Sequence, residues 1–366
     1  MDETTGNNSV TGASISEVAG REAFEAIGGW PGVLGRLMAR EDLSVDEAAG
    51  AMGQVLMGQA THAQLAALAT ALRMKGETVN EMTGLVRAYH EHAEPLEVQG
   101  DLVDTCGTGG DRSHSVNVST ISALVVAGAG GRVCKHGNRA ASSAAGSADV
   151  LEALGVVIDL GPQGVIRCIE EAGMGFCYAP RFHPAMRFAI PVRRELGIAT
   201  VFNFLGPLAN PAHARHQVVG VSDPRMVDRM LGVLQANGAR RAMVVHGADG
   251  LDELSTTGSS EVLQLFEDGT TSRSTVDPIE LGFKPATLED LRGGDAVANA
   301  NALRRVLDGE NGPHRDITLL NAAAGLVVAG LAVDLAEGIA KAAVAIDEGL
   351  AARALDRLVA VSQSAA

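Results

Sequence analysis

The sequence predicts an α/β protein in which a small helical domain precedes a large domain built on a mainly parallel central sheet. Residues 30–92 carry helical signals and few strand signals, whereas short apolar runs alternate with helical stretches after about residue 100. The chain of 366 residues has the length of about two domains. Its apolar content of 46% suffices for a large packed core, which excludes a mostly disordered protein.

We expect three parts along the chain. Residues 1–28 are rich in Gly, Ser and Thr and predict a flexible N-terminal tail. Residues 29–97 are expected to form the small helical domain, and residues 98–366 the α/β domain.

Capping signals and one apolar face predict the helices of the first domain. Ser44 with Glu47, and Thr78 with Glu81, have the spacing of capping boxes, each before an apolar-periodic segment. Between them, one apolar face of a helix is formed by Leu65, Leu68, Ala69 and Leu72. Gly76 is expected to end that helix.

The second domain differs from the first in its short apolar runs, which alternate with helical stretches. Its predicted strands are Leu102–Asp104, Arg132–Cys134, Gly155–Leu160, Gly175–Tyr178, Val218–Val221 and Ala242–Val245. Glu261–Asp277 predicts a hairpin that turns at Asp268 and Gly269. Asn299–Val306 and Ile317–Ala354 are Ala-rich and predict helices that cover the sheet.

The net charge and the cysteine spacing argue against several classes of protein. The net charge is −15, so general binding of nucleic acid is disfavoured, and any phosphate site needs local dipoles or a metal ion. The four cysteines include no C-x-x-C pair, which argues against a zinc site and predicts reduced thiols in a cytoplasmic protein. No apolar stretch reaches the roughly 20 residues of a membrane span, and no signal peptide is evident.

A glycine-rich segment, Asp104–Asp111, follows a predicted strand and precedes Asn117–Thr120, where an apolar helix opens. Glycines in such a loop can point successive backbone N–H groups inward, and a helix N-terminus adds partial positive charge. The loop therefore predicts a phosphate site, although a tight turn with a serine cap is the alternative. It matches neither the dinucleotide fingerprint nor the Walker pattern.

Cations and hydroxyls gather about 24 residues later, in Lys135–Ser143 and Gly146–Asp149. In so acidic a chain, such a loop after a strand fits a second anion clamp better than a solvated basic turn. The adjacent carboxylates of Asp252 and Glu253 follow another apolar run and suit Mg²⁺, although alone they are more often a solvated loop. Arg193, taken alone, is more often a surface ion-pair partner of Glu195 or another acid.

Together these segments resemble the signature segments of the anthranilate phosphoribosyltransferase family, in the family's order and near its spacing. The resemblance covers about residues 30–360. The matching segments are Gly107–Asp111, Asn117–Thr120, Lys135–Ser143, Gly146–Asp149, Arg193–Gly197, Phe202–Pro211 and His246–Leu254.

The resemblance implies which residues bind each substrate. For 5-phosphoribosyl-1-pyrophosphate (PRPP) these are Gly107, Gly110, Asp111, Ser115, Asn117, Val118, Ser119, Thr120, Lys135, His136, Gly137, Asn138, Arg139, Ala140, Ala141, Ser142, Ser143 and Ser147. For anthranilate they are Gly107, Asn138 and Arg193, whose guanidinium can pair with a planar carboxylate. The matching magnesium ligands are Ser119, Asp252 and Glu253.

The resemblance also implies a fold, a reaction and an assembly. The fold is nucleoside-phosphorylase-like, that of class IV phosphoribosyltransferases, and about residues 181–208 contribute to the helical domain. The phosphoribosyl group of PRPP passes to the amine of anthranilate, a step of tryptophan biosynthesis, with Mg²⁺ as cofactor. A homodimer through the helical domain, and no membrane or nucleic-acid partner, are expected. No residue is predicted to act as nucleophile or general base.

Two other functions remain open from the residues. A pyrimidine-nucleoside phosphorylase shares the fold, but Asp252 with Glu253 and the segment 135–138 argue against it. A nucleic-acid-binding relative needs a basic groove, which the charge of −15 disfavours. His136 either orients a substrate or makes a structural hydrogen bond, and His183–Pro184 and Phe202–Pro211 are expected to be hinge and packing elements beside the acceptor pocket.

Overall fold

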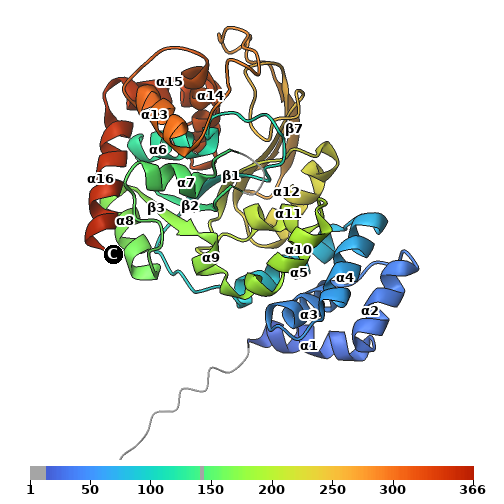
Figure 1. The fold of residues 1–366 in the computed structure, drawn as a ribbon. Helices are drawn as coiled ribbons and strands as arrows, with labels where there is room; N and C mark the ends of the chain where they lie inside the picture. Colours follow the sequence, from blue (N-terminus) through green and yellow to red (C-terminus); the bar gives the residue numbers. More distant parts are fainter. Residues whose placement is uncertain (1–13, 141–143) are drawn as a thin grey trace, which may run out of the picture.

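The computed structural model describes residues 14–140 and 144–366, and it places a helical bundle beside a larger α/β body (Figure 1). The bundle comprises α1 (Ile15–Ala26), α2 (Gly29–Met38), α3 (Val45–Leu56), α4 (His62–Lys75) and α5 (Val79–Glu91). Both predicted capping boxes are formed, at the starts of α3 and α5. The four predicted apolar residues of α4 are buried, and Gly76 ends that helix with a φ of +92°.

The expected N-terminal tail is wrong from Ile15 onward, because α1 belongs to the bundle. Ser14 caps this helix by accepting a hydrogen bond from the backbone N–H of Glu17. Phe24 is buried and meets Trp30 edge-on, with ring centroids 5.6 Å apart. Gly20 and Phe24 also pack closely on Gly50 of α3, and these contacts with the bundle outweigh the polar composition that predicted a tail. Residues 1–13 lie outside the described part of the chain.

A seven-stranded sheet forms the centre of the α/β body, in the order β3-β2-β1-β4-β5-β6-β7. Its strands are β1 (Val103–Gly107), β2 (Val133–Gly137), β3 (Met174–Tyr178), β4 (His216–Gly220), β5 (Arg241–Gly247), β6 (Ser260–Leu265) and β7 (Thr271–Val276). The first five are parallel neighbours, and β6 and β7 are added antiparallel. The mainly parallel sheet and the hairpin at Glu261–Asp277 are thus confirmed.

One predicted strand, Gly155–Leu160, is wrong. Val156, Ile158 and Leu160 are buried alternately, which is the pattern that suggested a strand. However, the Val157 N–H donates to the Ser362 hydroxyl, and the Val156 N–H donates back to the Leu151 carbonyl. The segment therefore lies extended against the core without joining the sheet.

Helices cover both faces of the sheet (Figure 1). The helices that follow the bundle are α6 (Val118–Gly128), α7 (Ser147–Ala153), α8 (Pro162–Ala172), α9 (Ala179–Phe182), α10 (Ile190–Leu196), α11 (Phe202–Leu205), α12 (Val227–Ala236), α13 (Ala296–Leu307), α14 (Pro313–Val328), α15 (Leu335–Asp347) and α16 (Leu350–Ser364). The last four confirm the predicted C-terminal helices. Of the others, α10 contacts α4 and α11 contacts α5 of the bundle. Within the described residues, every helix is too short or too polar to cross a bilayer.

Two hydrophobic clusters share the sheet. Val218 and Val245 point into one cluster, formed with the C-terminal helices, while Val219 and Val244 point into the other. That second cluster also holds the apolar residues of the helical bundle and of the segment 186–209. The bundle is therefore packed onto one face of β4 and β5 through a continuous core.

Candidate functional site

A cavity of about 520 Å³ opens at the carboxyl ends of β1 and β2. In open α/β sheets this is the edge where ligands bind, because the loops that leave the parallel strands meet there. All predicted site residues that the structure describes line this cavity, from Gly107 to Ser147 and with Arg193, Asp252 and Glu253. Ala141, Ser142 and Ser143 lie outside the described residues.

The glycine-rich loop after β1 is shaped by close contact with Asp252. A Cβ on Gly107 would lie 2.2 Å from Asp252 Oδ2, so any other residue there would displace the Asp252 carboxylate. Gly109 and Gly110 have φ values of +66° and +81°, and the Gly109 N–H donates to Asp252 Oδ2 at 2.7 Å. The Thr108 N–H donates to the Gly220 carbonyl. The sequence predicted that successive N–H groups of this loop point inward to bind an anion. That prediction is partly wrong, because the Thr108 and Gly109 N–H groups donate to the protein itself.

Acidic side chains gather beside this loop. Burial, together with the charge of Asp111, raises the pKa of Asp252 to about 6. Burial and the charge of Asp252 also raise the pKa of Glu253 well above its usual value, while the Ser119 N–H donates to that carboxylate. A cation placed here would relieve this repulsion.

The oxygen ligands at this place suit Mg²⁺ better than a metal ion whose ligands all come from the protein. Among residues 14–140 and 144–366, no three His, Cys, Asp or Glu side chains are arranged to hold an ion. Mg²⁺ ordinarily takes one or two carboxylates and fills its other positions with water and substrate phosphates. Asp252, Glu253 and the Ser119 hydroxyl provide such an incomplete set.

Lys135 and His136 lie beneath the cavity at the end of β2. Lys135 is 1% exposed, and its ammonium donates to the Thr105 carbonyl and the Ser119 hydroxyl. Within the described chain Lys135 forms no ion pair at contact distance, but its charge partly offsets the rise that burial causes in the pKa of Asp104 and in the pKa of Glu253. His136 Nδ1 lies 3.1 Å from the Gly206 carbonyl, and burial lowers the pKa of this imidazole well below its usual value. His136 is therefore neutral and at least partly structural.

The next loop is held by its own contacts. Arg139 pairs with Asp149 and Glu152 at 2.9 and 2.8 Å, so much of its charge is already balanced. The Ser147 hydroxyl donates to the Asn138 backbone carbonyl at 3.4 Å, and the Asn138 side-chain oxygen accepts from the Arg139 N–H at 2.7 Å, so the Asn138 side chain that lines the cavity is held at its oxygen.

Arg193 lies on α10, on the side of the cavity facing the helical bundle. Its guanidinium carbon is 5.8 Å from the Phe202 ring centroid, and it forms no ion pair with any described residue. The alternative of a surface pair with Glu195 is therefore wrong. A guanidinium over an aromatic ring, without a carboxylate partner, is suited to hold the carboxylate of a planar ligand.

Several lining residues were not predicted from the sequence. Tyr89 on α5, Pro180, Met186 and Ile190 form apolar parts of the wall. No chemical motif marks such residues, and only the fold brings α5 against the segment 179–190. His183, Pro184, Phe202, Asn203, Gly206 and Pro207 also line the cavity, so the segments expected beside the acceptor pocket form part of its wall.

Comparisons with known proteins agree with this geometry. Two family models match: the α/β domain of a glycosyl transferase family over residues 99–352, and its helical bundle domain over residues 31–93. An anthranilate phosphoribosyltransferase of Salinispora arenicola is 52% identical, over 92% of this chain and 97% of its own length.

Solved structures give the same result. The crystal structure of anthranilate phosphoribosyltransferase from Thermus thermophilus superposes with a TM-score of 0.86 at 44% identity, over 90% of this chain and 99% of that one. The enzyme from Saccharomyces cerevisiae, in complex with PRPP and Mg, superposes with a TM-score of 0.83 at 26% identity, over 92% and 98% of the two chains.

Proposed function

Because this chain belongs to the anthranilate phosphoribosyltransferase family, we propose that it transfers the phosphoribosyl group of PRPP to the amine of anthranilate and releases pyrophosphate. One observation of the structure supports this most strongly: the residues that match the family's PRPP, anthranilate and magnesium positions line one cavity. The comparisons favour neither the nucleoside phosphorylase nor the nucleic-acid-binding alternative.

The PRPP side of the cavity is the part formed by the α/β body. Lys135, the N-terminus of α6 and the loop after β1 supply positive charge and donors for phosphate oxygens. Ser119, Asp252 and Glu253 would hold Mg²⁺, which when bound neutralises charge on the pyrophosphate as it leaves. In a chain of net charge −15, this local arrangement explains how a polyanionic substrate is bound.

The anthranilate side lies between α10 and the segment from Gly206. Arg193 binds the carboxylate and Asn138 orients the ring, which positions the amine for attack. The amine nitrogen bonds to C1 of the ribosyl group, the C1–O bond to pyrophosphate breaks, and the nitrogen loses a proton. Because that nitrogen is already neutral at pH 7, no strong base is required and no covalent enzyme intermediate forms.

The wider setting follows from the same family. We place the reaction in tryptophan biosynthesis in the cytoplasm and expect a homodimer formed through the helical bundle. Ile15 and Met38, which are 92% and 81% exposed on α1 and α2, supply apolar surface for that contact. Sedimentation velocity of the full chain tests it, and a monomer at micromolar concentration contradicts it.

The activity is tested by following anthranilate fluorescence after mixing the protein with anthranilate, PRPP and Mg²⁺. We expect a decay that needs all three components and stops with EDTA. The Asp252→Asn, Glu253→Gln double variant should lose most turnover while retaining its fold by circular dichroism. No decay from folded wild-type protein contradicts the function, and phosphorolysis of uridine would then be measured.

A further inference from the structure

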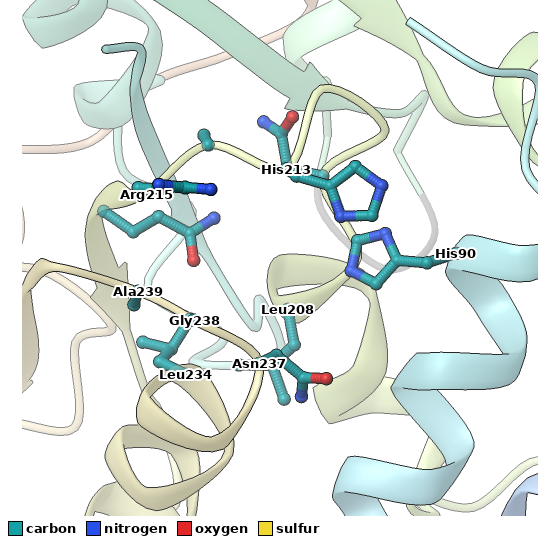
Figure 2. Close-up of a pocket in the computed structure, with 11 residues that line it drawn as sticks. His90, Leu208, His213, Arg215, Leu234, Asn237, Gly238 and Ala239 are labelled. Atoms are coloured by element: carbon teal, nitrogen blue, oxygen red, sulfur yellow. The ribbon is translucent and has the colours of Figure 1, made fainter. Parts of the chain in front are cut away.

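A second cavity, of about 210 Å³, lies at the opposite end of the sheet, where β4 and β5 begin (Figure 2). Its wall comes from the end of α5, the segment leading into β4, and the end of α12. Leu208 and Asn210 belong to it, while Gly206 and Pro207 of the same segment line the first cavity. Nothing in the proposed reaction uses this second cavity.

Three polar side chains of this cavity lack partners within the described residues. Gln217 is 3% exposed, yet its amide makes no hydrogen bond. His90 Nδ1 is buried without a partner. The Arg215 guanidinium forms no ion pair, although acidic residues outnumber basic ones in the chain by 44 to 29. Buried polar groups are nearly always hydrogen-bonded, so the buried His90 Nδ1 points to a ligand, and the exposed, unpaired Arg215 and the Gln217 amide beside it offer that ligand further partners.

The charge of the wall selects an anion. His90 and His213 stack with ring centroids 4.1 Å apart (Figure 2). Burial lowers the pKa of His90 to about 3 and also lowers that of His213, so both rings are neutral at pH 7. No carboxylate lines the cavity, which leaves Arg215 as its one charged group in the described chain. One guanidinium pairs best with one planar carboxylate.

The side of the second cavity opposite Arg215 favours a ligand that carries hydrogen-bond donors. Leu234, Asn237 and Gly238 lie at the C-terminal end of α12, across the cavity from Arg215 (Figure 2). Helix C-termini carry partial negative charge, which disfavours a dianion such as phosphate. The Asn237 amide nitrogen already donates to the Val233 carbonyl, so its oxygen remains an acceptor.

We propose that this cavity binds a small organic monocarboxylate, held by Arg215, whose other end carries an amino or hydroxyl donor directed at Asn237 and the end of α12. The two stacked imidazoles and Leu208 form one side of the site, and the Gln217 amide hydrogen-bonds the bound molecule.

The test is an NMR titration of the full chain with isotope-labelled histidines at pH 7.5. Signals of His90 and His213 are assigned with the variants His90→Gln and His213→Gln. L-Serine serves as the probe with both groups, acetate as the carboxylate alone, ethanolamine as the donor alone, and inorganic phosphate as the dianion. We expect L-serine to shift both signals saturably, acetate more weakly, and ethanolamine not at all.

Variants that each remove one arginine charge show where the L-serine probe binds. Arg215 is exposed and unpaired, so Arg215→Gln should fold normally and weaken L-serine binding at least tenfold, because a charge-assisted hydrogen bond contributes about 1.5–3 kcal/mol. Arg240→Gln removes the same charge nearby, from a residue paired with Asp101 and Glu267, and should change nothing. Arg193→Gln, in the first cavity, should also change nothing.

Four results would overturn the proposal. They are no saturable shift with L-serine, equal affinity in Arg215→Gln, loss of the shifts in Arg193→Gln, and tighter binding of phosphate than of L-serine. The third would place the probe in the first cavity, and the fourth would assign the site to a dianion.

Discussion

At the acceptor side of the first cavity, Arg193 is the cation that we propose binds the anthranilate carboxylate. Because hydrogen bonds to charged groups contribute about 1.5–3 kcal/mol, Arg193→Ala should raise the KM for anthranilate about 10- to 150-fold. The KM for PRPP should change far less, since PRPP binds the α/β side. Steady-state kinetics with each substrate varied in turn measure both constants.

Arg194 provides the matched control. It follows Arg193 on the same helix, carries the same charge and is exposed outside the cavity. Arg194→Ala should leave both KM values within about twofold of wild type. Equal effects of Arg193→Ala on both substrates would remove Arg193 from the role of carboxylate anchor.

A second residue, His183, should make stability depend on pH. It is 5% exposed, lies 2.9 Å from the Ala209 carbonyl through Nε2, and burial lowers its pKa to about 4. Between pH 7.5 and 5.5 the unfolded chain therefore takes up a proton here that the folded chain does not. The free energy of unfolding should fall by about 1.3 kcal/mol from this residue as the pH falls.

The effect is isolated by comparing wild type with His183→Gln in denaturant titrations at both pH values. The stability advantage of wild type should shrink by that amount at pH 5.5. Raised carboxyl pKa values, as at Asp252 and Glu253, act in the opposite direction but cancel in this difference. An advantage independent of pH would mean that His183 has the same pKa in the folded protein as in the unfolded chain.

At the scale of elements, two capping boxes of the same type differ in burial. Glu81 is 0% exposed and accepts from the Leu43 and Thr78 N–H groups and from the Lys75 ammonium. Glu47 caps α3 closer to solvent, with its side chain 16% exposed. Glu81→Ala should cost about 3–5 kcal/mol of unfolding free energy, and Glu47→Ala about 1 kcal/mol. Urea denaturation of the two variants measures the difference, and equal costs would contradict it.

The same elements show what the sequence could predict. Capping boxes, glycine stops and the hairpin turn are local, so α3, α4, α5 and β6–β7 follow from nearby residues. Gly155–Leu160 has the burial pattern of a strand, but pairing depends on neighbours far away in the chain. Helix α1 depends on packing against α3 and on Phe24 meeting Trp30, contacts that composition does not reveal.

The candidate site also contains residues that could be predicted from the sequence and residues that could not. Charged and glycine residues such as Lys135 and Gly107 could be predicted because their chemistry is tied to motifs. Tyr89 and Met186 could not, because apolar wall residues are indistinguishable from core until the fold places them. The internal use of the Gly109 N–H was equally hidden, since it depends on Asp252, which is 143 positions away.

At the scale of the whole molecule, the helical bundle and the sheet share one core. Val219 and Val244 from the sheet belong to the same buried cluster as Leu68 and Trp30 from the bundle. Helix α12 lies between them and contacts α5. Any movement of the bundle relative to the sheet would therefore have to bend the connecting segments without opening this core.

The shared core predicts that the bundle and the α/β body unfold together. Trp30 is the only tryptophan and is 8% exposed inside the bundle, so its fluorescence reports the bundle alone. Far-UV circular dichroism reports the helices of both parts. In urea the two signals should give the same midpoint, as cooperative unfolding requires. Trp30→Phe should abolish the fluorescence change and leave the dichroism transition in place. A fluorescence midpoint at clearly lower urea would mean that the bundle unfolds first, and that its packing on α12 is too weak to couple it to the sheet.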